Sequence, residues 1–401
     1  MHTDPEAPNI QNVPIARSLE SVEPSRIREL ANIVFAMEDV LQLHFGESNM
    51  PTPRYIRDAA VAALDEGYLF YTENAGLPGL RAAIADKYSE IHDVTIDPRF
   101  EIVVTASGVQ ALNVAIRCVI DPGDEAIILS PNWPNAKAIV NMYGGRAVEV
   151  PFLTMSEGFE IDFEALETAI SPRTRLLAYT SPSNPLGWAA TLDDQRRLLE
   201  YCRRHRLWLL ADEVYERIYY KGSAAPSILR LCTRDDAVIV AQSFSKTYCM
   251  TGWRLGWIVS RGDLAHKAAQ LNEFIVSHAA AMVQRAGEIA LGGDDQEIID
   301  MAEVLHKRVE YCYKAIEELN LVRVAKPAGA FYLFPRIEGI TDSFAFAKAL
   351  LEKAQVSVAP GIAFGKGGEG SVRLCCASDF SVLEPAMERI RAFIEGESYL
   401  E

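Results

Sequence analysis

The chain has 401 residues, more than one hydrophobic core usually serves, so we expect one large and one smaller domain. Hydrophobic residues make up 49% of the chain and charged residues 23%, a composition typical of folded globular proteins. The formal net charge of −16 and the absence of any basic cluster with interleaved aromatic residues argue against nucleic acid as a partner.

The seven cysteines are an odd number and include no Cys-x-x-Cys pair, so the sequence predicts neither a disulfide framework nor a zinc site. The first ten residues, MHTDPEAPNI, lack a cationic region followed by an apolar one, and no apolar run approaches membrane-spanning length. We therefore expect a cytoplasmic protein with no metal and no membrane contact.

The first fifty residues are broken by prolines and are too few to form a domain of their own. Between about residues 100 and 260, short aliphatic runs alternate with polar turns and helical patterns. The five runs are residues 101–105, 126–129, 176–180, 207–211 and 237–241. Continuous apolar strands alternating with helices predict an α/β fold with a mostly parallel sheet covered on both faces.

After about residue 295 the pattern changes. A long amphipathic helix is predicted over residues 298–319, strand-like segments at 329–335 and 371–376, and a helix around Ser343–Ala354. We expect a smaller α+β domain here, on which the N-terminal segment packs. The expected division is therefore 51–295 for the large domain, and 1–50 together with 296–401 for the smaller one.

Ligands of a parallel sheet bind beyond the carboxyl ends of its strands, so the turns after the five runs are where chemistry is expected. Lys246 follows the last run in a serine-rich turn. A lysine that loses hydration there has a lowered pKa and becomes a nucleophilic amine. The ordinary alternative is a solvated surface lysine, so the hypothesis depends on the residues that accompany it.

Asp212 directly follows the apolar run 207–211. A carboxylate in this place suits a pyridinium nitrogen, which it keeps protonated so that the ring can withdraw electrons. It suits equally well the N-cap of a following helix, and the residues alone leave both interpretations open.

A phosphate site is suggested by Ser107, Gly108 and Val109 at a strand-to-helix turn, where free N–H groups and the helix dipole attract anions. Additional donors are available from three residues near Lys246, namely Ser243, Ser245 and Arg254. The glycine motif at 365–370, GKGGEG, fits G-x-G-x-x-G but leads into a strand-like segment, so we reject it as a dinucleotide site.

Three further polar or aromatic residues stand in these turns. Trp133 could stack on a flat ring, and Asn184 and Tyr215 could hydrogen-bond a phenolic ring oxygen. Each has a structural alternative: a core tryptophan, a plain Asn-Pro turn, and packing of a helical tyrosine.

Together these turns resemble the class I aminotransferases of pyridoxal-phosphate (PLP) fold type I, and the resemblance covers nearly the whole chain. Its most specific segment is 243–257, SFSKTYCMTGWRLGW, which is similar to the family pattern S-x-[SA]-K followed by a glycine and R-x-G. Other matching blocks occur in family order, at 71–85, 121–131, 184–187, 211–215, 329–335 and 372–374. The resemblance implies a large domain with a mostly parallel sheet of seven strands.

The resemblance also implies transfer of an amino group between an L-amino acid and a 2-oxo acid, in ping-pong order, through a Schiff base on Lys246. Asp212 would hold the ring nitrogen, and Tyr215 and Asn184 would contact the 3′ oxygen. The other implied roles are ring stacking by Trp133, phosphate binding by Ser107, Gly108, Val109, Ser243, Ser245 and Arg254, and substrate binding by Gly46, Asn184 and Arg373, the last gripping the α-carboxylate. Tyr71 would reach the cofactor phosphate of a partner subunit, which implies a homodimer.

The sequence departs from the family pattern in two places. Leu186 stands where the family often has threonine, and Val109 where a hydroxyl or lysine assists the phosphate. We find no arginine placed to pair with a side-chain carboxylate of the substrate, since Arg285 lies in a helical pattern that predicts a structural role.

Another PLP reaction, such as that of a carbon–sulfur β-lyase or a synthase, would use the same residues and stays open as an alternative. A non-catalytic effector-binding module is opposed by the acidic N-terminal segment, which contains no basic recognition helix. A nicotinamide oxidoreductase is excluded, because no strand leads into G-x-G-x-x-G and then a helix.

Overall fold

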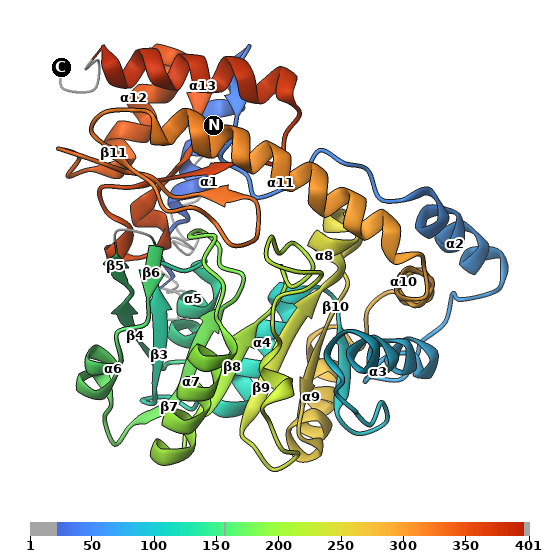
Figure 1. Cartoon of the computed structure of the whole chain (residues 1–401). Coiled ribbons are helices and arrows are strands. Elements are labelled where there is room, and N and C mark those ends of the chain that lie inside the picture. Colours follow the sequence, from blue (N-terminus) through green and yellow to red (C-terminus); the bar gives the residue numbers. More distant parts are fainter. Residues whose placement is uncertain (1–21, 156–157, 397–401) are drawn as a thin grey trace, which may run out of the picture.

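The computed structural model describes residues 22–155 and 158–396. A central sheet lies between layers of helices, and long helices with short strands from both ends of the described chain gather at the top of Figure 1. Within the two described ranges, none of the helices combines the length and apolar character that spanning a membrane requires.

The central sheet contains seven strands, in the spatial order β2, β10, β9, β8, β7, β3, β4. Their bounds are β2 (Ile102–Thr105), β3 (Glu125–Ser130), β4 (Arg146–Pro151), β7 (Thr174–Thr180), β8 (Trp208–Asp212), β9 (Val238–Ser243) and β10 (Gly256–Ser260). Neighbouring strands pair parallel except at β10, which is antiparallel to both β2 and β9. The predicted α/β fold with a mostly parallel sheet is confirmed, and each of the five predicted runs overlaps one strand.

Two of the seven strands, β4 and β10, lie outside the five predicted runs. β4 is an edge strand that pairs only with β3, and Arg146 and Glu149 interrupt its apolar residues. β10 pairs antiparallel with β9 after a short connection, so the sequence contains no crossover helix before it that would indicate a further strand.

Helices cover both faces of the sheet because alternate strand residues point to opposite sides. On β2, Val103 packs in one cluster with residues of α4 (Gly108–Val119), α5 (Asn135–Met142) and α9 (Gly262–Ile275). Ile102 and Val104 belong to a second cluster that extends into the C-terminal elements. The other helices of this part are α2 (Arg54–Asp65), α3 (Pro78–His92), α6 (Phe163–Ala169), α7 (Leu192–His205), α8 (Phe244–Thr247) and α10 (Ala281–Leu291).

The C-terminal elements begin with α11 (Asp295–Glu317), which contains most of the predicted helix 298–319. The helix begins before the predicted residue because the Asp294 side chain caps it, accepting from the N–H of Gln296 at 2.9 Å. The helix predicted at α12 (Ser343–Ala354) is confirmed. The predicted strand segments contain β12 (Tyr332–Leu333) and β16 (Val372–Cys375), which pair with each other. The other C-terminal elements named here are β11 (Val322–Arg323), β13 (Arg336–Ile337), β15 (Ala359–Pro360) and α13 (Phe380–Glu395). Between β4 and α6, the short strands β5 (Leu153–Met155) and β6 (Gly158–Glu160) pair antiparallel with each other.

The described part of the N-terminal segment lies on these C-terminal elements. α1 (Arg26–Val34) packs against α12 and β15, and β1 (Leu41–Gln42) pairs parallel with β14 (Val356–Ser357). The chain therefore passes from the C-terminal group into the sheet region near residue 50 and returns to that group at α11.

Gly256 at the start of β10 permits a close approach of three backbone segments. A Cβ atom at this position would lie 2.6 Å from the carbonyl oxygen of Gln242 and 2.7 Å from the backbone nitrogen of Gly108. Because both are backbone atoms, they cannot move aside as a side chain would. We expect Gly256→Ala to lower the free energy of unfolding by about 1–3 kcal/mol, as overpacking does.

Denaturant unfolding measures this change. Gly252→Ala is the matched control, because a Cβ at Gly252 would meet no atom within 4 Å. Equal midpoints for both variants would contradict the tight contact between β10 and the turn before α4.

Candidate active site

The turns at the carboxyl ends of the strands meet around a cavity of about 210 Å³. All the residues predicted for the site line it, except Ser107, Tyr71 and Arg373. Six lining residues were not predicted: Leu112, Asn135, Thr180, Val214, Thr251 and Tyr332. Of these, Val214, Thr251 and Tyr332 stand inside matched sequence blocks, at 211–215, 243–257 and 329–335, which is the signal that pointed toward them.

One end of the cavity is suited to an anion. Ser107 caps α4 by accepting from the N–H of Gln110 at 3.1 Å, so the N–H groups of Gly108 and Val109 begin the helix without intrahelical acceptors. The hydroxyls of Ser243 and Ser245 lie 2.8 Å apart at the same end. The exposed Arg254 adds a guanidinium that forms no ion pair with any described carboxylate. Helix terminus, hydroxyls and guanidinium together form a cradle for a phosphate group.

Asp212 is the last residue of β8 and is 8% exposed. Its carboxylate accepts one weak hydrogen bond, from the N–H of Val214 at 3.4 Å, and has no ion pair with a described cation. Burial raises the pKa of Asp212 to about 7, an effect that the charge of Lys246 partly opposes. The alternative interpretation as a helix N-cap is wrong, because residues 214–217 form turns and not a helix.

Lys246 lies in α8, a single helical turn that directly follows β9. Its ammonium group donates to the carbonyl oxygen of Gly46 at 2.5 Å and lies 5.7 Å from the ring centres of Tyr215 and Phe331. Burial, with a smaller contribution from the charge of Arg373, lowers the pKa of Lys246 to about 8. At pH 7 roughly a tenth of the amine is therefore neutral and nucleophilic.

A second cavity, of about 510 Å³, opens on another side of Lys246 and shares Ser245 and Thr251 with the first. Its other walls include Glu47, Met50 and Phe331. Lys246 thus lines both cavities.

Arg373 on β16 is fully buried and forms no ion pair with a described carboxylate. Its guanidinium donates to the Asn184 side-chain oxygen at 3.1 Å and to the carbonyl oxygen of His44 at 2.5 Å, while its Nε has no partner. Arg373 does not itself line the 210 Å³ cavity, but Asn184, Trp133 and Tyr332 beside it do. A buried guanidinium with an unused donor is suited to a carboxylate ligand.

Asn184 and Tyr215 present hydrogen-bonding groups to the cavity. Because the side-chain oxygen of Asn184 accepts from Arg373, its amide nitrogen is left as a donor. Tyr215 is buried in the turn after β8, not on a helix, and its hydroxyl lies 2.7 Å from that of Tyr332. Trp133 is half-buried, with its ring 6.2 Å from that of Phe364.

Tyr71 lies away from this cavity and is 90% exposed. Its ring meets that of His278 edge-on at 5.6 Å, and His278 Nε2 accepts from the N–H of Thr72 at 3.2 Å. Phe70 and Phe274 are also strongly exposed. Tyr71 is therefore held on an apolar surface and does not reach the cavity of its own chain.

Two other sequence interpretations concern residues outside the cavities. Arg285 lies on α10 and pairs with Glu288 at 2.7 Å, as expected for a structural residue. The motif at 365–370 contains a short 3-10 turn, Lys366–Gly368, and leads into the strand β16, as the sequence predicted, and not into a helix.

The raised pKa of Asp212 predicts a pH-dependent stability. Because the folded-state pKa lies above the unfolded one, ionised Asp212 opposes folding, and the free energy of unfolding falls as pH rises from about 4 to about 7. In protein stripped of ligands, Asp212→Asn should therefore be more stable than wild type at pH 8, by up to about 4 kcal/mol, and gain much less at pH 5.

Urea unfolding at the two pH values measures this difference. Asp86→Asn, which changes an exposed aspartate of α3, is the matched control. An equal gain in stability for Asp212→Asn at pH 5 and pH 8 would contradict the raised pKa of Asp212.

Comparison with known proteins agrees with this geometry. Residues 38–390 match the family model of aminotransferases class I and II. Relatives include an aspartate aminotransferase of Pyrococcus horikoshii, 34% identical over 96% of this chain and 98% of its own length. Another is aromatic-amino-acid aminotransferase 2 of Thermococcus litoralis, 33% identical over 94% of this chain and 97% of its own.

A solved alanine aminotransferase from Pyrococcus furiosus superposes with a TM-score of 0.90 and 28% identity, over 96% of this chain and all of its own. These relatives are aminotransferases, which favours amino-group transfer over a lyase, a synthase or a non-catalytic module. The chain is an enzyme that belongs to the class I and II aminotransferases, the PLP-dependent family of fold type I that uses amino acids and 2-oxo acids as substrates.

Proposed function

We propose that the 210 Å³ cavity binds PLP and that Lys246 is the residue to which the cofactor is attached. The observation that carries the proposal is the buried, unpaired carboxylate of Asp212 in the same cavity as the amine of Lys246. A protonated ring nitrogen would give Asp212 the cation that the described residues do not supply. The phosphate would lie at the other end, on the α4 terminus with Ser243, Ser245 and Arg254.

When bound, PLP supplies a ring that withdraws the electrons left when the substrate Cα–H bond breaks. Asp212 keeps a positive charge on the ring nitrogen favourable, because a buried carboxylate is stabilised by a cation beside it. Tyr215 and the amide of Asn184, which line the cavity, would donate hydrogen bonds to the 3′ oxygen of the cofactor, and Trp133 would supply an aromatic ring on which it stacks.

Substrate binding would depend on Arg373 and Gly46. The Arg373 guanidinium binds the α-carboxylate common to all amino acids, and Asn184 and His44 hold its orientation. The Gly46 carbonyl, which now accepts from Lys246, lies where the backbone can line the pocket. Lys246 Nζ would take the proton from the substrate Cα and later return one, since its lowered pKa leaves part of the amine neutral.

We also propose that the protein is a homodimer in which Tyr71 completes the partner's phosphate site. Support comes from the exposed Tyr71, Phe70 and Phe274, an apolar surface of the kind that an interface covers. His278 fixes the Tyr71–Thr72 segment from the same chain, which would give the tyrosine a defined direction.

We propose further that residues 51–295 form the large domain, and 1–50 with 296–401 the smaller one; of these, residues 1–21, 156–157 and 397–401 lie outside the described residues. The packing of α1 and β1 on the C-terminal elements supports this division. The seven free cysteines support a reducing, cytoplasmic location.

The central test is amino-group transfer. Purified enzyme, PLP, an amino-donor panel and 2-oxoglutarate should yield glutamate, and Lys246→Ala should reduce the rate by at least about 10²–10⁴-fold because the proton carrier is lost. Lys348→Ala, an exposed lysine on α12, should leave the rate unchanged. Wild-type turnover in Lys246→Ala would refute the assigned role.

The dimer proposal is tested by complementation. Lys246→Ala and Tyr71→Ala chains, coexpressed with different tags and purified through both, should regain one intact site per dimer, or about half the activity of wild type. Each variant alone should stay well below this value. No recovery in the mixed dimer would contradict a site shared between subunits.

A further inference from the structure

We propose that Tyr332 is a positioning residue: it holds the Tyr215 hydroxyl for the cofactor and fixes the Arg373 guanidinium for the substrate. The inference rests on the proposed function of the same cavity. None of the roles implied by the family resemblance was assigned to Tyr332, although it lies in a matched block of the sequence.

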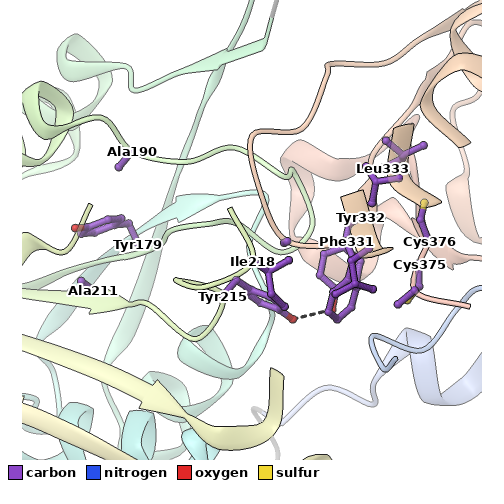
Figure 2. Close-up of a cluster of buried hydrophobic side chains, with 14 of the residues drawn as sticks. Tyr179, Ala190, Ala211, Tyr215, Ile218, Phe331, Tyr332, Leu333, Cys375 and Cys376 are labelled. Carbon is purple, nitrogen blue, oxygen red and sulfur yellow. Dashed lines mark hydrogen bonds between the residues drawn. The ribbon is translucent and has the colours of Figure 1, made fainter. Parts of the chain in front are cut away.

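Tyr332 stands on β12 and is fully buried, yet it lines the 210 Å³ cavity. Its hydroxyl lies 2.7 Å from that of Tyr215, a contact drawn as a dashed line in Figure 2. β12 pairs with β16, so Tyr332 faces Cys375 across the ladder and is fixed beside the strand that carries Arg373. Figure 2 shows the two tyrosines approaching from opposite sides, Tyr215 from the turn after β8 and Tyr332 from the C-terminal elements.

Two more contacts surround the Tyr332 ring. The Arg373 guanidinium carbon lies 4.7 Å from the centre of the ring, close enough for a cation–π contact. A Cβ atom at Gly46 would come within 2.4 Å of the Tyr332 hydroxyl, so this hydroxyl fills the space that the missing side chain leaves. Gly46 in turn accepts from Lys246 through its carbonyl oxygen. Tyr332 therefore touches three proposed site residues from three separate chain segments.

The direction of the hydrogen bond between the Tyr215 and Tyr332 hydroxyls follows from the number of protons that they can donate. Each tyrosine has one hydroxyl proton. If Tyr215 donates its proton to the 3′ oxygen of the cofactor, only Tyr332 can donate in the contact between the two hydroxyls. A hydroxyl that accepts a hydrogen bond becomes a stronger donor, so Tyr332 strengthens the donation by Tyr215. The charged and titratable groups that face this pair are Asp212 from β8, Lys246 from α8, and Arg373 and Cys375 from β16.

Stronger donation to the 3′ oxygen favours its deprotonated form, so it lowers the pH at which the linkage between Lys246 and the cofactor titrates. Tyr332→Phe keeps the ring on Arg373 and removes only the hydroxyl. The pH midpoint of the cofactor absorbance should rise by about half a unit or more, whereas KM for amino donors should change less than about twofold. Tyr332→Leu removes the ring as well, so KM should rise in addition, by about tenfold.

The experiment is a pH titration of cofactor absorbance in the holoenzyme, with KM and kcat measured on the same preparations. Tyr179→Phe is the matched control, because Tyr179 is equally buried in the same cluster but does not line the cavity (Figure 2). Its midpoint should equal that of wild type. A Tyr332→Phe midpoint equal to wild type, or a raised KM with no shift in midpoint, would overturn the inference.

Failure of the underlying proposal would look different. If the wild-type protein developed no pH-dependent cofactor band, PLP would not be attached in this cavity, and the role of Tyr332 would fall with it. If wild type titrated normally and only Tyr332→Phe failed to shift, the proposed function would stand and the positioning role alone would be rejected.

Discussion

The buried carboxylate of Asp212 is the constraint on which the rest of the site depends. It stands at the end of an apolar strand, it is 8% exposed, and no described cation pairs with it. Keeping such a group ionised opposes folding, and the raised pKa of Asp212 expresses that cost. A bound cationic ring would reverse the effect, because the same carboxylate then stabilises the complex. Ionised Asp212 therefore lowers the free energy of unfolding of the ligand-free protein, and binding of a cationic ring would restore it.

Arg373 presents the complementary case. It is a fully buried guanidinium with one unused donor and no described carboxylate partner. Asp212 thus lacks a cation and Arg373 lacks an anion, and a pyridinium cofactor together with an amino acid substrate would supply both. The sheet makes this arrangement possible because the ends of β8 and β9 lie next to each other, while β10 returns antiparallel and brings Gly256 against the turn before α4.

Local sequence patterns were sufficient to predict most strands of the sheet and the family. Apolar runs located five strands of the sheet, because strands buried on both faces carry few polar residues. The segment around Lys246 was specific enough to indicate the family. Two strands escaped detection for physical reasons: β4 is an edge strand with charged residues, and β10 needs no crossover helix. The turn after β8 was also misjudged, since Asp212 followed by a helical pattern is typical of an N-cap.

Local sequence patterns could not predict contacts between segments that are far apart in the chain. Tyr215 and Tyr332 are 117 residues apart, and Arg373 meets His44 across 329 residues. These contacts depend on how the C-terminal elements pack on the sheet, and this packing cannot be predicted from any short segment of the sequence. Arg373 and Tyr71 illustrate the limit: the sequence names both residues, but only the fold places one beside the cavity wall and the other on an exposed surface.

The central claim is that Lys246 carries the cofactor. Borohydride reduction of the purified holoenzyme, followed by digestion and mass spectrometry, tests it directly, because reduction makes the attachment permanent. We expect a single pyridoxyl group, on the peptide that contains Lys246. A pyridoxyl group on any other lysine, or no label at all in enzyme that is active with PLP, would contradict it.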